Sequence, residues 1–132
     1  MSVTYPKGFL ASGVQAGLKQ SGRDMALIVN PGPVDSCANV FTSNRAIANP
    51  VIWSKEVAKT GKARAVVINS GGANCFTGPQ GFQLTHKTAE SAANLLGHAP
   101  IEILVASTGL IGEQLDETKV ISGIKKAACN IG

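Results

Sequence analysis

A strand-like segment that ends in a small hydroxyl residue and a glycine is the first feature of this chain that could do chemistry. The segment 101–106 is apolar and rich in β-branched residues, and Ser107, Thr108 and Gly109 follow it directly. Such an ending places a threonine hydroxyl beside an unobstructed backbone N–H at the rim of a sheet. Two donors in this arrangement can stabilise the oxyanion that forms during acyl transfer. Because Ser-Thr-Gly is also a common turn sequence, an ordinary turn remains the alternative.

A glycine-rich loop between a predicted strand and a predicted helix is the second candidate. It runs over 69–78, and Gly71 and Gly72 free its backbone for close approach to an anion at a helix N-terminus. The loop has neither the Lys-Ser/Thr pair of a Walker loop nor the Gly-x-Gly-x-x-Gly pattern of dinucleotide folds, which argues against a nucleotide site. In the alternative interpretation, the glycines only turn the chain, while Asn69 and Asn74 tie down its backbone.

A cysteine close to this helix start is a weaker candidate. A helix N-terminus lowers the pKa of a thiol, so Cys75 could be an activated nucleophile. A nucleophilic cysteine also needs a base, and the sequence ties neither His86 nor His98 to it, which favours a small buried side chain. Together with Cys37 and Cys129 it shows no C-x-x-C spacing, so we expect free thiols in a reducing compartment and no metal site.

A sheet and several helices are predicted to position these candidates. Strands are expected over 9–18 (a strand or a bent hairpin arm), 24–30, 37–42, 51–53, 63–69 and 101–106. Helices are expected over 55–60, over 78–96 and after 116, with Ser54 and Asp116 as N-caps and Gly61 and Gly97 as C-terminal stops. This order predicts an α/β (α+β) fold with a mixed sheet and helices on one face.

Two of the expected helices carry apolar stripes. The stripe of the longer helix consists of Phe82, Ala89, Ala92, Ala93 and Leu96. The stripe of the last helix consists of Val120, Ile121, Ile124 and Ala128. We expect the second stripe to be a surface for segments outside this sequence.

Size and charge limit the class of protein. The chain has 132 residues, 44% of them hydrophobic, which suits a single domain or a partial domain over 1–132. Only 15% are charged, below the usual value of about 25%, so a partner is expected to cover part of the surface. The net charge of +4 is scattered, and the one dense stretch, 55–64, has only Trp53 nearby, which argues against nucleic-acid binding. With no membrane-length apolar run and no signal-peptide core, a cytoplasmic protein is expected.

Several motifs, in order along nearly the whole chain, resemble the ornithine acetyltransferase family (glutamate N-acetyltransferase). They are Pro6–Phe9, Ala11–Val14, Asp24–Ile28, Val40–Asn44, Ala48–Val51, Asn69–Asn74 and Ala106–Gly112. The family is of the N-terminal-nucleophile type, in which a precursor cuts itself before a threonine that becomes the nucleophile of the second chain. The resemblance identifies this sequence with the N-terminal part of the α-chain, which lacks that threonine.

The resemblance also implies a fold and residue roles. The expected architecture is an α-β-β-α sandwich. The Thr108 hydroxyl and the Gly109 N–H would form the oxyanion hole, with Ile111 and Gly112 positioning the turn. The loop residues Asn69, Gly71, Gly72 and Asn74 would shape the cleft nearby. Substrate-binding residues are expected beyond residue 132.

The implied activity is acetyl transfer from N-acetylornithine to glutamate in arginine biosynthesis, through an acetyl-threonine intermediate. No cofactor is expected, although some family members accept acetyl-CoA as a co-substrate. The implied partner is a β-chain that carries the nucleophile, in a heterotetramer of two α and two β chains, and the segment alone is expected to be inactive. Two alternatives remain: a related N-terminal-nucleophile hydrolase or acyltransferase of the same fold, and a truncated non-catalytic remnant.

Overall fold

A four-stranded mixed sheet forms the centre of the computed structural model, which describes residues 2–132. The strands are β1 (Leu10–Val14), β2 (Met25–Val29), β3 (Ala65–Asn69) and β4 (Ile103–Ser107), and they lie in the order β1-β2-β3-β4. The pairs β1–β2 and β2–β3 are antiparallel, whereas β3 and β4 are parallel. The predicted mixed sheet is therefore confirmed, with strands at four of the six expected places.

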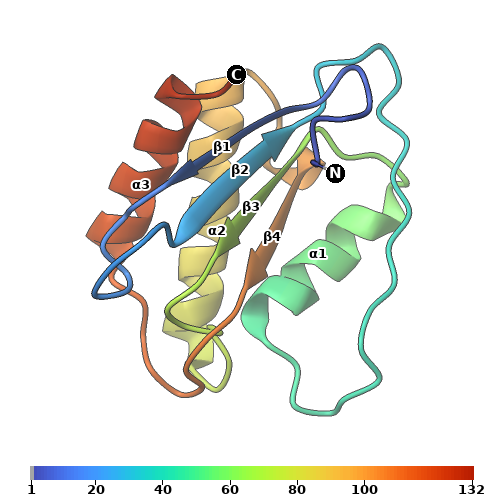
Figure 1. Cartoon of the computed structure of the whole chain (residues 1–132). Coiled ribbons are helices and arrows are strands. Elements are labelled where there is room, and N and C mark those ends of the chain that lie inside the picture. Colours follow the sequence, from blue (N-terminus) through green and yellow to red (C-terminus); the bar gives the residue numbers. More distant parts are fainter. Residues whose placement is uncertain (1) are drawn as a thin grey trace.

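Three helices pack against the sheet (Figure 1): α1 (Asn49–Lys59), α2 (Gly78–Leu96) and α3 (Glu117–Cys129). A short 3-10 turn, η1 (Pro100–Glu102), precedes β4. Helices α2 and α3 lie behind the sheet in Figure 1, and α1 lies beside β4. Among residues 2–132, no helix is both long and apolar enough to cross a bilayer.

The core lies between the sheet and α2 and α3. Alternate residues of β2, β3 and β4 face it, as Leu27, Val67 and Val105 do, each no more than 5% exposed. The helices contribute small residues such as Ala92 and Ala127, which let them approach the sheet closely. Burial of this continuous apolar layer is the main stabilising term of the fold.

The opposite face of the sheet is covered by no helix, and we call it the open face. Its residues are apolar yet only half-buried: Ala26, Ile28, Val66, Ile68 and Leu104. Strands with apolar residues on both faces are typical of a sheet that is covered on both sides. The second sheet of the expected sandwich is not among residues 2–132.

Helix α1 covers the free edge of β4. Trp53 Nε1 donates to the Ile103 carbonyl at 2.8 Å, and the Ser54 hydroxyl both donates to the Val105 carbonyl and accepts from the Val105 N–H. Both side chains are buried. The backbone groups that an edge strand leaves unpaired are thus satisfied by a helix.

Two predicted strands are wrong, and one predicted cap with them. Segment 37–42 forms no strand, and Val40 is fully exposed, because the segment has no neighbouring strand with which to pair. Segment 51–53 belongs to α1, which begins at Asn49 with Pro50 in its first turn, where the missing N–H costs nothing. Ser54 therefore lies inside the helix rather than at its N-cap.

Two helix faces also differ from the prediction. In α2, Phe82 is 38% exposed, and the buried face includes Thr85 and Thr88, whose hydroxyls donate to carbonyls one turn earlier. This back-bonding lets a threonine occupy an apolar position. In α3, Val120 and Ile124 are buried in the core of this chain, so its stripe is not a surface for other segments. The predicted Asp116 cap is confirmed, since its carboxylate accepts from the Lys119 N–H.

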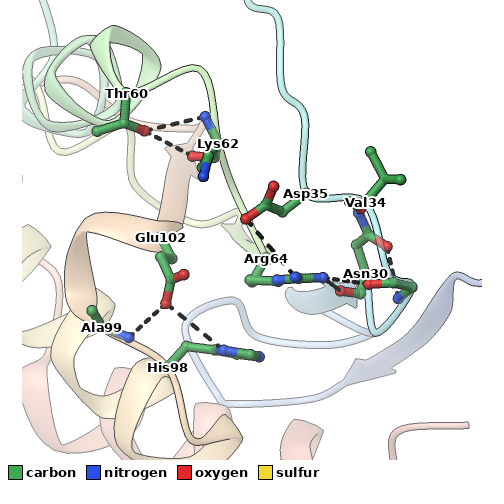
Figure 2. A network of polar contacts seen from close by, with 10 residues as sticks. Asn30, Val34, Asp35, Thr60, Lys62, Arg64, His98, Ala99 and Glu102 are labelled. Carbon is green, nitrogen blue, oxygen red and sulfur yellow. Dashed lines mark hydrogen bonds and ion pairs between the residues drawn. The ribbon is translucent and has the colours of Figure 1, made fainter.

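The end of the sheet where β3 and β4 begin, which we call the Arg64 end, is held by charged side chains (Figure 2). The Arg64 guanidinium donates to the Gly32 carbonyl at 2.5 Å and to the Asn30 carbonyl at 3.3 Å, and lies 3.8 Å from the Asp35 carboxylate. On the neighbouring turn, the Glu102 carboxylate accepts from the Ala99 N–H. These contacts close the loops at this end.

Candidate active site

The candidate residues gather at the opposite end of the sheet, which we call the Thr108 end. The strand register aligns Met25, Asn69 and Ser107 across three strands. The next residues outward, where the strands stop, include Ser70 and Thr108. The loops after β3 and β4 therefore start side by side, as the carboxyl ends of parallel strands do.

Thr108 and Gly109 present their donors to solvent. Both residues are exposed, and among residues 2–132 neither the Thr108 hydroxyl nor the Gly109 N–H has a hydrogen-bond partner. The backbone of Thr108 is held, because its N–H donates to the Asn69 carbonyl at 3.0 Å. A fixed backbone with two free donors is an arrangement that can accept an oxygen atom bearing negative charge.

The glycine loop lies in direct backbone contact with this pair. Gly109 has φ +126°, and a Cβ atom built on it would lie 2.6 Å from the Gly72 nitrogen. Gly71 is equally confined, since its Cβ would lie 2.9 Å from the Leu18 carbonyl oxygen. Only glycines fit these positions. The structure therefore brings together the two segments that the sequence singled out.

The two asparagines of the loop have different surroundings. Asn69 is 5% exposed and contacts the end of β4 through Ser107 and the glycine loop through Gly72. Asn74 is 2% exposed, has φ +51°, and donates from Nδ2 to the Gly81 carbonyl and to Thr85 of α2. Asn74 thus ties the loop to the helix, as the structural alternative predicted, and does not line the opening.

Cys75 has the environment of a small buried side chain, which is the interpretation that the sequence favours over an activated nucleophile. It is a free thiol with 5% of its surface exposed, and Cys37 and Cys129 are free as well. Its carbonyl accepts from the Gly112 N–H at 2.8 Å, and the Ala73 N–H donates to the Leu110 carbonyl. These two bonds fasten the glycine loop to the turn that follows Gly109.

Asp24 is a buried acid that sequence reasoning passed over as a site residue. It is 3% exposed, and its carboxylate accepts from the N–H groups of Ala16, Leu18 and Lys19 at 2.6–2.9 Å. Burial alone would raise the pKa of Asp24, but these donors outweigh it and hold the pKa below its ordinary value. The Asp24 carbonyl also accepts from Ser70, so this acid braces the site. Its sequence signals were a turn before a strand and its place in the Asp24–Ile28 motif of the resemblance.

An open pocket of about 320 Å³ lies where the open face meets the Thr108 end. Thr108 lines it together with Ile68 and Arg23, whose side chain lies over Gly13. The Asp24 carboxylate is occupied by backbone donors, and Arg23 has no ion-pair partner among residues 2–132. The pocket is therefore a mostly apolar recess with Arg23 at its wall, and it lies beside the two free donors. Within the same residues, no cluster of three metal-ligating side chains occurs.

Similar solved structures define the class. An ornithine acetyltransferase from Mycobacterium tuberculosis, complexed with ornithine, is 46% identical with a TM-score of 0.97 over 98% of this chain and 70% of that chain. The arginine biosynthesis bifunctional protein argJ from Bacillus halodurans is 35% identical, with a TM-score of 0.91 over 97% of this chain and 69% of that one. The fold is thus the α/β fold of the N-terminal-nucleophile acetyltransferases.

The sequence comparison narrows the class to one family. A sequence model of the ArgJ family matches residues 10–132. The arginine biosynthesis bifunctional protein ArgJ of Streptomyces coelicolor is 57% identical over 97% of this chain, and that of Bifidobacterium longum is 50% identical over 96%. The chain belongs to the ArgJ family, and the expected resemblance is confirmed. It spans about a third of the length of these curated relatives (34% and 33%).

Proposed function

We propose that this chain is part of an acetyltransferase of arginine biosynthesis that moves an acetyl group from N-acetylornithine to glutamate. The observation that carries the proposal is the pair of free donors, the Thr108 hydroxyl and the Gly109 N–H, on a fixed backbone beside an open pocket. The similarity to an acetyltransferase described in complex with ornithine supports this choice of substrate.

The proposed reaction uses the donor pair twice. A threonine hydroxyl from the rest of the protein attacks the acetyl carbonyl, and Thr108 and Gly109 stabilise the resulting oxyanion. Collapse of this intermediate breaks the amide bond, and the leaving amine takes up a proton as ornithine departs. The glutamate amine then attacks the acetyl-threonine ester, and the same donors stabilise the second oxyanion. Collapse of that intermediate breaks the ester bond, the threonine oxygen takes up the proton that the amine loses, and N-acetylglutamate departs. Acetyl-CoA could replace N-acetylornithine as acetyl donor, and no bound cofactor takes part.

The remaining parts of the proposal concern segments outside these 132 residues. This chain covers 34% of the curated Streptomyces coelicolor relative but 70% of the Mycobacterium tuberculosis chain, a difference expected if a precursor is cut in two. The β-chain so formed would carry the nucleophile and most substrate contacts, in a cytoplasmic assembly of two α and two β chains. The apolar open face suits contact with a second sheet, and the segment alone would be inactive.

A threonine substitution tests the proposed role. In the complete, processed protein, Thr108→Val keeps the β-branched shape and removes only the hydroxyl, so acetyl transfer should fall by about 10²–10³-fold. The KM for N-acetylornithine should change little, because the donor acts on the transition state. Thr108→Ser keeps the hydroxyl and should retain most activity. Unchanged turnover in Thr108→Val would contradict the oxyanion role and show that residues 107–109 form only an ordinary turn.

A further inference from the structure

Asn69 is the residue through which the two loops of the candidate site are joined. It is the last residue of β3, and the parallel register pairs it with Ser107 at the end of β4. Its side chain continues the row of buried positions that Ala65 and Val67 begin, so an amide lies where the strand pattern places apolar groups. With only 5% of its surface exposed, this amide requires partners inside the protein.

Within residues 2–132, the side-chain hydrogen bonds of Asn69 go to Ser107 at the end of β4 and to the loop after β3. Its Oδ1 accepts from the Ser107 hydroxyl at 2.5 Å, while its Nδ2 donates to the carbonyls of Gly72 at 3.3 Å and Ser70 at 3.4 Å. Its backbone carbonyl accepts the Thr108 N–H. Asn69 therefore holds Ser107, Thr108 and the glycine loop, against which Gly109 packs.

We propose that Asn69, with Ser107, is a positioning residue that keeps the Thr108 hydroxyl and the Gly109 N–H directed at one point. The proposal rests on the proposed oxyanion role of that pair. Oxyanion donors act at about 2.7–3.1 Å, and a misplacement of about 1 Å can cost about 10²-fold in rate. Because Gly109 is in backbone contact with Gly72, any shift of the glycine loop moves the Gly109 N–H.

The chemistry of an amide explains why this position needs asparagine. An amide carries both an acceptor and a donor. The Asn69 acceptor binds the Ser107 hydroxyl on one side, and its donor binds the Gly72 carbonyl on the other. An aspartate of the same shape would keep the acceptor, lose both donors and add a negative charge beside the forming oxyanion. A leucine would fill the space but leave the buried polar groups of both loops without their partner.

Variants of the complete, processed protein test this role. Asn69→Asp should lower kcat by about 10–100-fold at neutral pH with little change in KM, through misplaced donors and charge repulsion. Activity should partly recover as the pH falls and the new carboxyl is protonated, a profile that a merely structural role would not produce. The matched control is Ser12→Ala, which removes a serine bond from β1 to the Ala127 carbonyl of α3, away from the site. It should retain the wild-type kcat.

Ser107→Ala decides the question if Asn69→Asp fails to fold or to be processed. We expect a decrease in kcat of about 3–10-fold, and a smaller factor when Thr108→Val is already present, because residues that act through one another are not additive. Two outcomes beside an impaired Thr108→Val would overturn the positioning role and leave the oxyanion role standing. One is wild-type kcat in Ser107→Ala and in any processed Asn69→Asp, and the other is that the effects of Ser107→Ala and Thr108→Val on kcat are additive. An unimpaired Thr108→Val would overturn both.

Discussion

The two ends of the sheet are both rich in polar groups but use them differently. At the Arg64 end, the guanidinium donates to the Asn30 and Gly32 carbonyls and lies beside the Asp35 carboxylate. At the Thr108 end, Asp24 and Asn69 also hold the backbone by hydrogen bonds, yet the outermost donors have no partner among residues 2–132. A loop end that serves only stability saturates its hydrogen bonds, whereas this one keeps two donors free.

The contrast extends to the glycines. At the Arg64 end, Gly61 has φ +68° and open space where a Cβ would lie. At the Thr108 end, Gly71, Gly72 and Gly109 are each confined by atoms 2.6–2.9 Å from that position. Gly61 serves only a turn, whereas Gly71 and Gly109 let two backbones come into contact and Gly72 makes room for the Leu115 side chain. Close packing therefore marks the end that must place donors accurately.

Substituting alanine at one confined glycine should produce the largest effect. In the complete, processed protein, Gly109→Ala forces the turn away from Gly72 and so displaces the Gly109 N–H, which should lower kcat by about 10²-fold or more. Gly61→Ala, also at positive φ, should cost about 1 kcal/mol of stability and no activity. Equal kinetics of the two variants, measured by steady-state acetyl transfer, would erase the distinction between the ends.

Neutralising the buried acid at the Thr108 end should cost about 2–4 kcal/mol of unfolding free energy. Asp24→Asn replaces a carboxylate that accepts three backbone N–H bonds with a weaker acceptor and an unmatched donor. Asp35→Asn, at the other end, loses only a partly exposed contact at 3.8 Å and should cost under about 1 kcal/mol. Urea unfolding at pH 7 compares them, and equal losses would contradict the contrast.

The same acid predicts a pH dependence with a definite sign. Because the folded pKa of Asp24 is lower than its unfolded value, its stabilisation is fully present above the unfolded pKa. It is lost as the pH falls through the unfolded and then the folded pKa. Unfolding free energies measured from pH 7 downward should therefore converge for the wild type and Asp24→Asn, and a constant difference would argue against this assignment.

Removing the guanidinium at the Arg64 end should have a smaller effect, on stability alone. Arg64→Met keeps the aliphatic stem and leaves the Gly32 and Asn30 carbonyls to water, at a cost of about 1–2 kcal/mol. We expect a lower melting temperature with unchanged kcat in the processed protein. A loss of turnover would mean that the two ends are coupled.

The smallest effect is expected for an exposed ion pair of α1. Lys59 and Glu56 lie 2.7 Å apart, but their side chains are 71% and 55% exposed, so water screens the attraction. Lys59→Ala should change the unfolding free energy by no more than about 0.5 kcal/mol. A larger loss in thermal unfolding would show that surface charge contributes more to this fold than its burial pattern indicates.

Sequence patterns predicted those parts of the molecule whose causes are local. Segments 24–30, 63–69 and 101–106 are apolar on both faces and bounded by turn residues. The first two contain β2 and β3, and the third overlaps β4, which extends one residue further. Segment 37–42 has strand-forming residues but no neighbouring strand, which no local pattern reveals. Pro50 is a helix-start signal, and it indicates that segment 51–53 is helix rather than the predicted strand.

The candidate site was predictable to a similar extent. Thr108, Gly109 and the glycine loop were singled out by residue type and by resemblance, and their contact follows from adjacent parallel strands. The environment of Asp24 was not predictable, because its partners are backbone N–H groups of a hairpin loop folded back on it. The sequence places Asn69 at the end of the predicted strand 63–69 and Asn74 within the loop, but only the fold shows that the first faces the turn and the second faces α2.

The way α1 covers β4 has a consequence for how this molecule meets others. An uncovered edge strand can recruit a strand from another molecule and so begin aggregation. With the Ile103 carbonyl and both polar groups of the Val105 backbone bonded to Trp53 and Ser54, a strand arriving at β4 would first have to displace a helix. Intermolecular strand pairing at the β4 edge of the sheet is therefore blocked.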